Sequence, residues 1–349
     1  MRRETWEHAT RSVVLSAVGS LGLLAVAGPA RGEAPVADPD RRLVREAVGR
    51  GLGLVRAAAE NYPKHRTCFS CHHQTLPMLA IVTARAGGME VDDDELDVQA
   101  EFTRESFRER VADLGTGKNI GGGAMTVGYG LWALDLAGSE PDEVTEAMVA
   151  YLLKTQRPEG HWTTHGRRPP LEESTVTSTV LAASGMRTFA APGQREAADR
   201  AVARAVSWLE HAPETCQEDR NFRLWGLHKL GANREAVLKA RDAVLAAQRD
   251  DGGWSQHEDI ASDAYATGQT LALLAASGFP PTDPPARRGV ALLLESQHAD
   301  GSWKVETRAR PVQVYFDNGD PHGKHQFIST PASCWAVTAL AAATGREVP

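Results

Sequence analysis

The chain of 349 residues is 42% hydrophobic and 24% charged, and its formal net charge at pH 7 is −7. This composition excludes a disordered or fibrous protein and supplies enough apolar residues for the core of one large domain. The acidic balance also disfavours nucleic acid or an anionic membrane surface as the main partner.

The first 30 residues have the pattern of an export signal. Arg2, Arg3 and Arg11 precede an apolar run at residues 13–27, and small residues follow at 28–30. This order predicts a signal peptide at residues 1–30 and a location in the periplasm or outside the cell. An uncleaved signal that associates the chain with a membrane is the alternative. Residues 31–40 are then a polar linker, and residues 41–349 form one domain.

Apolar residues at helical spacing predict an all-helical domain built from pairs of helices. The first pair is residues 41–61 and an apolar helix that ends at Ala86. Five further pairs follow in chain order: 95–114 with 124–137, 142–155 with 174–184, 194–210 with 221–230, 234–247 with 262–277, and 285–296 with 328–343.

Glycines mark the end of the second helix of each pair, at positions 88, 138, 185, 231, 278 and 345. The intervals are 46 to 50 residues, except that the last is 67 because of an inserted segment at 304–326. This regular spacing predicts six stacked helical hairpins, since one hairpin cannot bury its apolar face alone. Such a stack forms either an open solenoid or a closed ring, and the lack of polar terminal caps favours the ring.

A short turn recurs at residues 156–162, 248–254 and 297–303. Each copy begins with Gln, passes through an acidic residue and Gly, and ends on Trp. These turns resemble the repeat of the squalene–hopene cyclase and protein prenyltransferase superfamily. The resemblance implies an all-α fold, an α6–α6 toroid, with the second helix of each hairpin in an inner ring and the first in an outer ring. The motif itself specifies the fold and says little about chemistry.

In such a ring the N-termini of the inner helices converge on one mouth. The position fifteen residues before each terminal glycine should lie there in every repeat, and three of the six residues can take part in acid–base, metal or thiol chemistry. The six positions are His73, Gly123, Pro170, Cys216, Asp263 and Thr330.

Asp263 is the first candidate catalytic residue. The segment at 258–263 resembles the acidic motif of the family's cyclases, and the resemblance implies that Asp263 is the proton donor and Asp259 its neighbour. His322 and His325, in the inserted segment, are the candidate helpers. The alternative is structural, because Ser262 or Asp263 is also suited to cap the N-terminus of the helix that follows.

A cyclase-like ring would bind an apolar, isoprenoid-type ligand against aromatic faces that stabilise positive charge. Six aromatic residues on the predicted inner helices are candidates for this lining: Tyr129, Trp132, Phe222, Trp225, Tyr265 and Trp335. The inserted segment adds Arg308, Arg310 and Asp317, because a long polar loop at a cavity mouth is often functional. The zinc site of the prenyltransferases is not expected, since Tyr265 stands where that family has a ligating Cys.

Cys68, Cys71 and His72 form a Cys-x-x-Cys-His motif. In an exported protein this spacing is typical of c-type haem, held by two thioether bonds to the cysteines, with the histidine as axial ligand. The second axial position is either open or filled by one of three nearby residues: His65, His73 or Met78.

Other interpretations of the same segment remain. Cys68 and Cys71 would also suit a local disulfide or a pair of free thiols. Adding His72 and His73 gives a zinc ligand set, although adjacent histidines rarely have the required geometry. Cys71 and Gln74 have the spacing of an internal thioester. Cys216 and Cys334 are expected to be small buried residues.

Three hypotheses for function follow. The first is a cyclase-like or other isoprenoid-related protein that binds an apolar ligand and carries out acid catalysis. The second is a haem protein for redox chemistry or electron transfer. The third is a binding or scaffold protein without catalysis.

Overall fold

The computed structural model describes residues 40–118, 120–164, 168–311 and 313–344, all of which belong to one compact unit that spans residues 36–349. The predicted signal peptide, almost all of the linker, and Gly345 lie outside the described residues. The described elements are α-helices, with short 3-10 turns at η1 (Tyr62–Lys64) and η2 (Gly323–His325). None of the described helices is long and apolar enough to cross a membrane.

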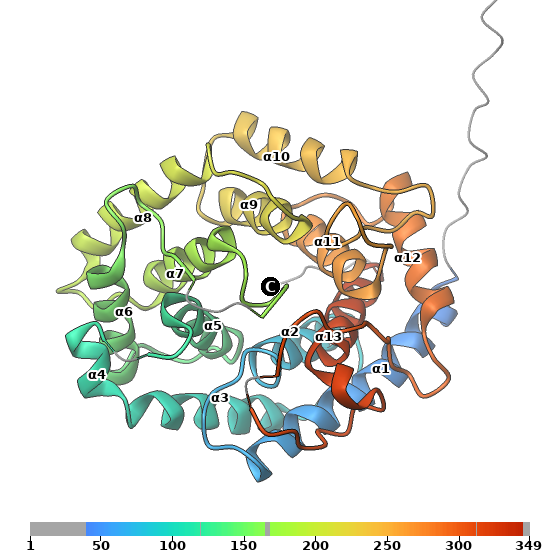
Figure 1. Ribbon diagram of the computed structural model, residues 1–349, viewed down its shortest axis with the longest axis horizontal. Helices are drawn as coiled ribbons and strands as arrows, with labels where there is room; N and C mark the ends of the chain where they lie inside the picture. The colour runs from blue at the N-terminus through green and yellow to red at the C-terminus, as the bar shows by residue number, and fades with distance from the viewer. Residues whose placement is uncertain (1–39, 119, 165–167, 312, 345–349) are drawn as a thin grey trace, which may run out of the picture. The chain divides into compact units, whose positions relative to one another are not determined.

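The helices form two concentric rings, as Figure 1 shows. The inner ring consists of α2 (Thr75–Ala86), α5 (Gly123–Leu136), α7 (Thr175–Phe189), α9 (Gln217–Lys229), α11 (Ala264–Ala276) and α13 (Gln326–Ala342). The outer ring consists of α1 (Arg41–Asn61), α3 (Asp93–Arg108) with the short α4 (Val111–Thr116), α6 (Glu143–Thr155), α8 (Arg195–Leu209), α10 (Arg234–Ala246) and α12 (Pro284–Ser296).

The inner ring is closed. Each inner helix packs against the next one along the chain, and α13, the last, packs against α2, the first. Inner helices are buried on nearly all sides, as on α5 and α13, whereas outer helices such as α1 and α8 bury a single apolar face. This difference is expected when helices of one ring are covered by those of the other. The predicted all-helical closed toroid is therefore confirmed.

The recurrent turns tie neighbouring hairpins together. Trp254 is fully buried, and its indole Nε1 donates a hydrogen bond to Val244 O at 2.8 Å. Gln248 Nε2 donates to Gly252 O within the turn and to Pro285 O at the start of the next outer helix. The copy at 297–303 joins the last outer helix to the first, because Gln297 Nε2 donates to Ala47 O of α1 at 2.9 Å. The turns are structural, as predicted.

Several expected boundaries were wrong. Gly185 does not end its helix, because it lies inside α7, where an added Cβ would come within 2.5 Å of Leu131 Cδ1. Its small size serves close packing between α5 and α7. Pro170 lies before α7 and Thr330 lies inside α13, as the predicted helix bounds imply, so neither is the first residue of its inner helix. The predicted helix at 95–114 is broken at residues 109–110 into α3 and α4.

Candidate functional site

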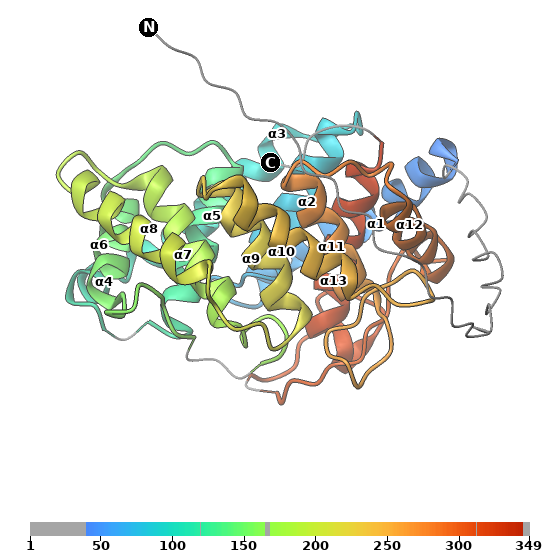
Figure 2. The same cartoon turned by 90° about the horizontal axis from the view of Figure 1, so that it is seen from above.

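A cavity of about 910 Å³ opens at the mouth of the ring, and we call it the mouth cavity. Figure 2 shows long loops gathered along the lower edge of the ring. The wall of the cavity comes from Tyr62 and residues 68–73, from Ser106, Phe107 and Arg110, from residues of 120–129, from Arg168 and Glu172, and from residues of 307–327. The inserted segment thus lies at the same mouth as the cysteine motif, as expected.

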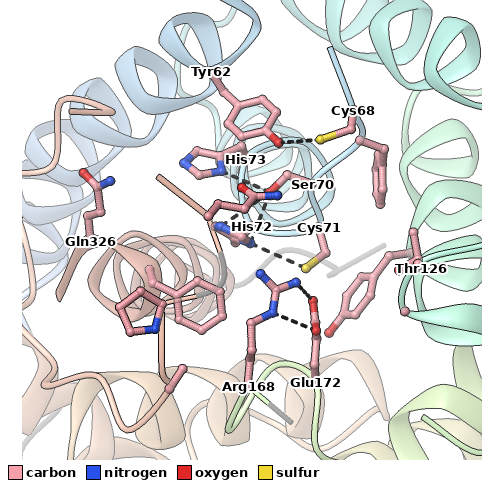
Figure 3. A pocket seen from close by; sticks show the side chains of 18 of the residues that line it. Tyr62, Cys68, Ser70, Cys71, His72, His73, Thr126, Arg168, Glu172 and Gln326 are labelled. Carbon is pink, nitrogen blue, oxygen red and sulfur yellow. Dashed lines mark hydrogen bonds and ion pairs between the residues drawn. The ribbon is translucent and has the colours of Figure 1, made fainter. Parts of the chain in front are cut away.

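The Cys-x-x-Cys-His motif forms one wall of this cavity. All of residues 68–72 line it (Figure 3), and they lie in the turn that leads into α2. Cys68 is exposed and Cys71 is buried, and both are free thiols. Burial, with a smaller contribution from the charge of Glu172, raises the pKa of the Cys71 thiol to about 12, so this thiol is protonated at neutral pH.

The two adjacent histidines differ in how their ring nitrogens are used. His73 is buried with both engaged: Nε2 accepts a hydrogen bond from Asn318 Nδ2 at 2.8 Å, and Nδ1 lies 3.1 Å from Ser70 Oγ. His72 Nδ1 lies 3.1 Å from the same Ser70 Oγ. His72 Nε2 is farther from that oxygen, at 3.5 Å, and no shorter hydrogen bond to Nε2 is found among the described residues. Burial lowers the pKa of His72 well below its ordinary value, so its imidazole is neutral.

An ion pair stands beside the motif. Arg168 Nε donates to Glu172 Oε2 at 2.8 Å, the guanidinium makes a second bond to the other carboxylate oxygen, and its carbon lies 5.3 Å from the centre of the Phe327 ring. Figure 3 shows this pair next to Cys71 and His72. Arg110, Arg310 and Lys324 also line the cavity, so four basic side chains reach a cavity whose other charged group is Glu172.

Tyr129, on α5, belongs to the cavity wall and is 1% exposed. Its ring stacks on Trp132, with ring centroids 6.2 Å apart, and Trp132 in turn contacts Trp225 and Trp335. These tryptophans, with Phe222, pack against one another between the inner helices and do not line the cavity. Of the six aromatic residues expected to form a lining, only Tyr129 does so.

Comparisons with known proteins agree with this architecture. No protein-family model matches the sequence. The chain is 28% identical over 236 residues to drimenyl diphosphate synthase of Streptomyces showdoensis, a match that covers 61% of this chain and 41% of that protein. It is 30% identical over 97 residues to lanosterol synthase of Candida albicans, which covers 24% of this chain and 13% of that protein. The chain thus spans less than half the length of these relatives.

Solved structures extend the similarity to the whole ring. The type II terpene cyclase MstE from Scytonema, in complex with its product merosterolic acid A, has a TM-score of 0.55 at 16% identity, covering 87% of this chain and 98% of that chain. The chain has the terpene-cyclase-like α/α toroid fold. A glycosidase has a similar TM-score of 0.57 at 13% identity, covering 86% of this chain and 98% of that chain. The toroid therefore does not identify the chemistry.

The structure places Asp263, the expected acid of a cyclase-like toroid, at the N-cap of α11. Its carboxylate accepts hydrogen bonds from Ala266 N and from Gln256 Nε2, each at 2.9 Å. Asp263 therefore caps α11, as the structural interpretation predicts. Burial raises the pKa of Asp263 to about 6, but the residue is not part of the mouth-cavity wall. Asp259 is exposed and also lies outside that wall.

Only some of the expected site residues of the inserted segment line the mouth cavity. His325 and Arg310 line the mouth cavity. His322 does not, and its Nε2 lies 2.8 Å from the buried Ser302 Oγ. Arg308 bonds to Gln256 Oε1, and Asp317 accepts from Gly319 N, also away from the cavity wall.

Glu218 was missed from the sequence. It lies in the first turn of α9, is 3% exposed, and accepts hydrogen bonds from Tyr265 Oη at 2.8 Å, Gln269 Nε2 at 2.9 Å and Thr177 Oγ1 at 3.3 Å. Burial raises the pKa of this carboxyl to about 7. The sequence predicts this helix at 221–230, and Glu218 lies outside those bounds. The feature of the sequence that could have indicated Glu218 is the run of charged residues at 218–220, directly before the predicted inner helix.

Proposed function

We propose that the chain is a c-type haem protein, with the haem held in the mouth cavity through Cys68 and Cys71 and with His72 as axial ligand. One observation carries the proposal: the Cys-x-x-Cys-His motif is not on an outer surface but forms a wall of a cavity of about 910 Å³. That volume is at the upper end of the range typical of cofactor sites, about 300–1,000 Å³.

The donor set fits the attachment chemistry. Each cysteine would add its S–H across one vinyl group of the haem, so that sulfur bonds to one vinyl carbon and the proton goes to the other, and no oxidant is required. Both thiols are free for this step. The predicted export of the chain would deliver it to the compartment where such attachment takes place.

The surroundings of His72 also fit an iron ligand. A ligating histidine is held by a hydrogen bond through its other ring nitrogen, which fixes the tautomer and leaves the ligating nitrogen with a lone pair. Ser70 Oγ, 3.1 Å from Nδ1, supplies that contact and leaves Nε2 for iron. The neutral state of the imidazole is the one that binds metal.

The remaining walls suit the two parts of a haem. Phe69, Phe107, Phe316 and Phe327 offer apolar faces to the macrocycle. The basic side chains of the wall, such as Arg310 and Lys324, match the negative carboxylates at its edge. When bound, the haem would supply a redox-active iron, and the chain would hold it and limit its contact with water.

The test is the visible spectrum of the chain produced with its own leader in a host that attaches c-type haem. We expect a haem absorption band that stays with the polypeptide after denaturation. The double variant Cys68→Ala, Cys71→Ala should lose it, whereas Cys216→Ala, which changes a buried cysteine outside the mouth cavity, should keep it. A colourless parent protein, from a host that loads a control cytochrome, would disprove the proposal.

A second candidate is an apolar isoprenoid-type ligand in the same cavity. It is supported by the aromatic wall and by the similarity to the type II terpene cyclase MstE, which was solved with its product, merosterolic acid A. Because Asp263 caps a helix outside the cavity wall, we propose binding rather than acid catalysis for this alternative. A fluorescent polyprenol should bind the haem-free chain, and Phe327→Glu should weaken binding. Phe279→Glu, at a half-buried phenylalanine outside the cavity, should not. Equal binding by both variants would rule this out.

A further inference from the structure

The Tyr129 hydroxyl is a buried polar group with no hydrogen-bond partner in the part of the chain that the structure describes. Its oxygen has almost no solvent-accessible surface. A hydroxyl buried in this way loses its hydrogen bonds to water without replacement, which is costly unless something else provides them. Because Tyr129 belongs to the wall of the mouth cavity, a ligand in that cavity is the natural partner.

The position of Tyr129 is fixed from several sides. Thr75 Oγ1, in the first turn of α2 and four residues after Cys71, donates to Tyr129 O at 2.9 Å. The Tyr129 ring is stacked on Trp132 and is 1% exposed. Burial and the nearby charge of Glu218 raise the pKa of Tyr129 well above its ordinary value, so the hydroxyl keeps its proton and remains a donor. A donor held in this way is preorganised for an acceptor.

Three side chains are the sequence candidates for the second axial ligand: His65, His73 and Met78. None of them both lines the cavity and has a lone pair available for iron. Met78 is fully buried in the core and His65 is exposed, and neither lines the cavity. Both ring nitrogens of His73 are engaged.

His325 does line the cavity, but its Nδ1 accepts the backbone N–H of Thr307 at 3.1 Å. A neutral imidazole has one acceptor and one donor nitrogen, so Nε2 of His325 carries the hydrogen. The other side chains of the wall with an atom that can bind iron are Tyr62, Met125, Tyr315 and Lys324.

We propose that the mouth cavity binds a small exogenous ligand on the open side of the haem, and that the Tyr129 hydroxyl donates a hydrogen bond to it. The ligand class is a small anion or diatomic molecule with a hydrogen-bond acceptor. This inference rests on the proposed haem site. It assigns the protein to ligand-binding haem proteins rather than to electron carriers whose iron is closed by two side chains.

The probe is fluoride, a small anion that accepts hydrogen bonds and donates none. The oxidised haem-loaded chain is titrated with sodium fluoride, and the absorption spectrum gives the dissociation constant. In Tyr129→Phe the constant should rise by about 10- to 100-fold, the effect of one hydrogen bond to a charged acceptor. Imidazole, which binds iron through a nitrogen lone pair and needs no donor from the protein, should bind both proteins with similar affinity.

Tyr265→Phe is the matched control, because the Tyr265 hydroxyl already donates to Glu218 and does not line the cavity. It should leave fluoride binding unchanged. The inference is overturned if fluoride binds the parent and Tyr129→Phe equally, or if the loaded parent binds no fluoride, which would show that the iron is closed by side chains of the wall. A chain that takes up no haem would instead refute the proposed function, and the spectrum before titration shows which has failed.

Discussion

The same substitution at two buried tyrosines should have opposite effects on stability. Tyr129 and Tyr265 are both 1% exposed and both lie on inner helices, but their hydroxyls differ. Tyr265 Oη donates to Glu218 Oε2 at 2.8 Å, whereas Tyr129 Oη has no partner among the described residues. Replacing each by Phe removes one oxygen and leaves the ring in place.

The expected magnitudes follow from these contacts. At pH 8 the Glu218 carboxyl, with its pKa of about 7, is mostly ionised, and a hydrogen bond to a charged group contributes about 1.5–3 kcal/mol. Tyr265→Phe should therefore lower the free energy of unfolding by about 2 kcal/mol. Tyr129→Phe removes an unpaired buried hydroxyl and should be neutral or stabilise the protein by up to about 1 kcal/mol.

Urea unfolding of the haem-free protein at pH 8 measures both values. The dependence of the unfolding free energy on urea concentration should be unchanged, so that a shift of the midpoint reports stability. Equal losses in the two variants would refute the reasoning, because the Tyr129 hydroxyl would then have a partner in the absence of ligand.

Three further predictions concern the ring. The Glu218 carboxyl has a pKa of about 7 in the folded protein, above its ordinary value of 4.5. The protonated carboxyl therefore stabilises the folded state below pH 4.5, and this contribution of about 3 kcal/mol is lost as the pH rises to 7. Glu218→Gln should flatten this part of the stability profile measured by urea unfolding. Trp254→Ala should cost about 3–5 kcal/mol in thermal or urea unfolding, since it empties a fully buried site in the turn that joins α10 to α11; a cost below about 1 kcal/mol would contradict that role. Asp263→Ala should cost about 1 kcal/mol through loss of the helix cap, while Asp263→Asn, which also caps helices, should cost less; equal losses would show that the carboxylate charge matters more than capping.

Local sequence patterns predicted the helices and their pairing, and the resemblance of the recurrent turns to a known superfamily implied the α6–α6 toroid. The first helix was placed at 41–61 and is found there as α1. Four of the expected terminal glycines, at 88, 138, 231 and 278, have the positive φ of a left-handed helix end. The prediction that Gly185 ends its helix was wrong. This glycine is small because Leu131 of another hairpin packs against it, and the sequence of a single helix does not reveal that contact.

The site was only partly predictable, because some of its residues come from segments that are far apart in the sequence. The Cys-x-x-Cys-His motif is contiguous, so its chemistry is visible in the sequence. Arg168 and Glu172 reach the same cavity from a loop about 100 residues further along the chain, and nothing local marks them. Asp263 resembles part of an acidic motif, but the same residue type in the same place also caps a helix, and its hydrogen bond from Ala266 N shows the capping role.

The mass of the denatured chain tests the central claim most directly. Haem held by two thioether bonds stays on the polypeptide through denaturation, so protein matured in a haem-attaching host should be heavier by one haem. After digestion, the added mass should be on the peptide that contains Cys68 and Cys71. A chain with the mass of the mature polypeptide alone, with Cys68 and Cys71 recovered as thiols or as a disulfide, would contradict the account.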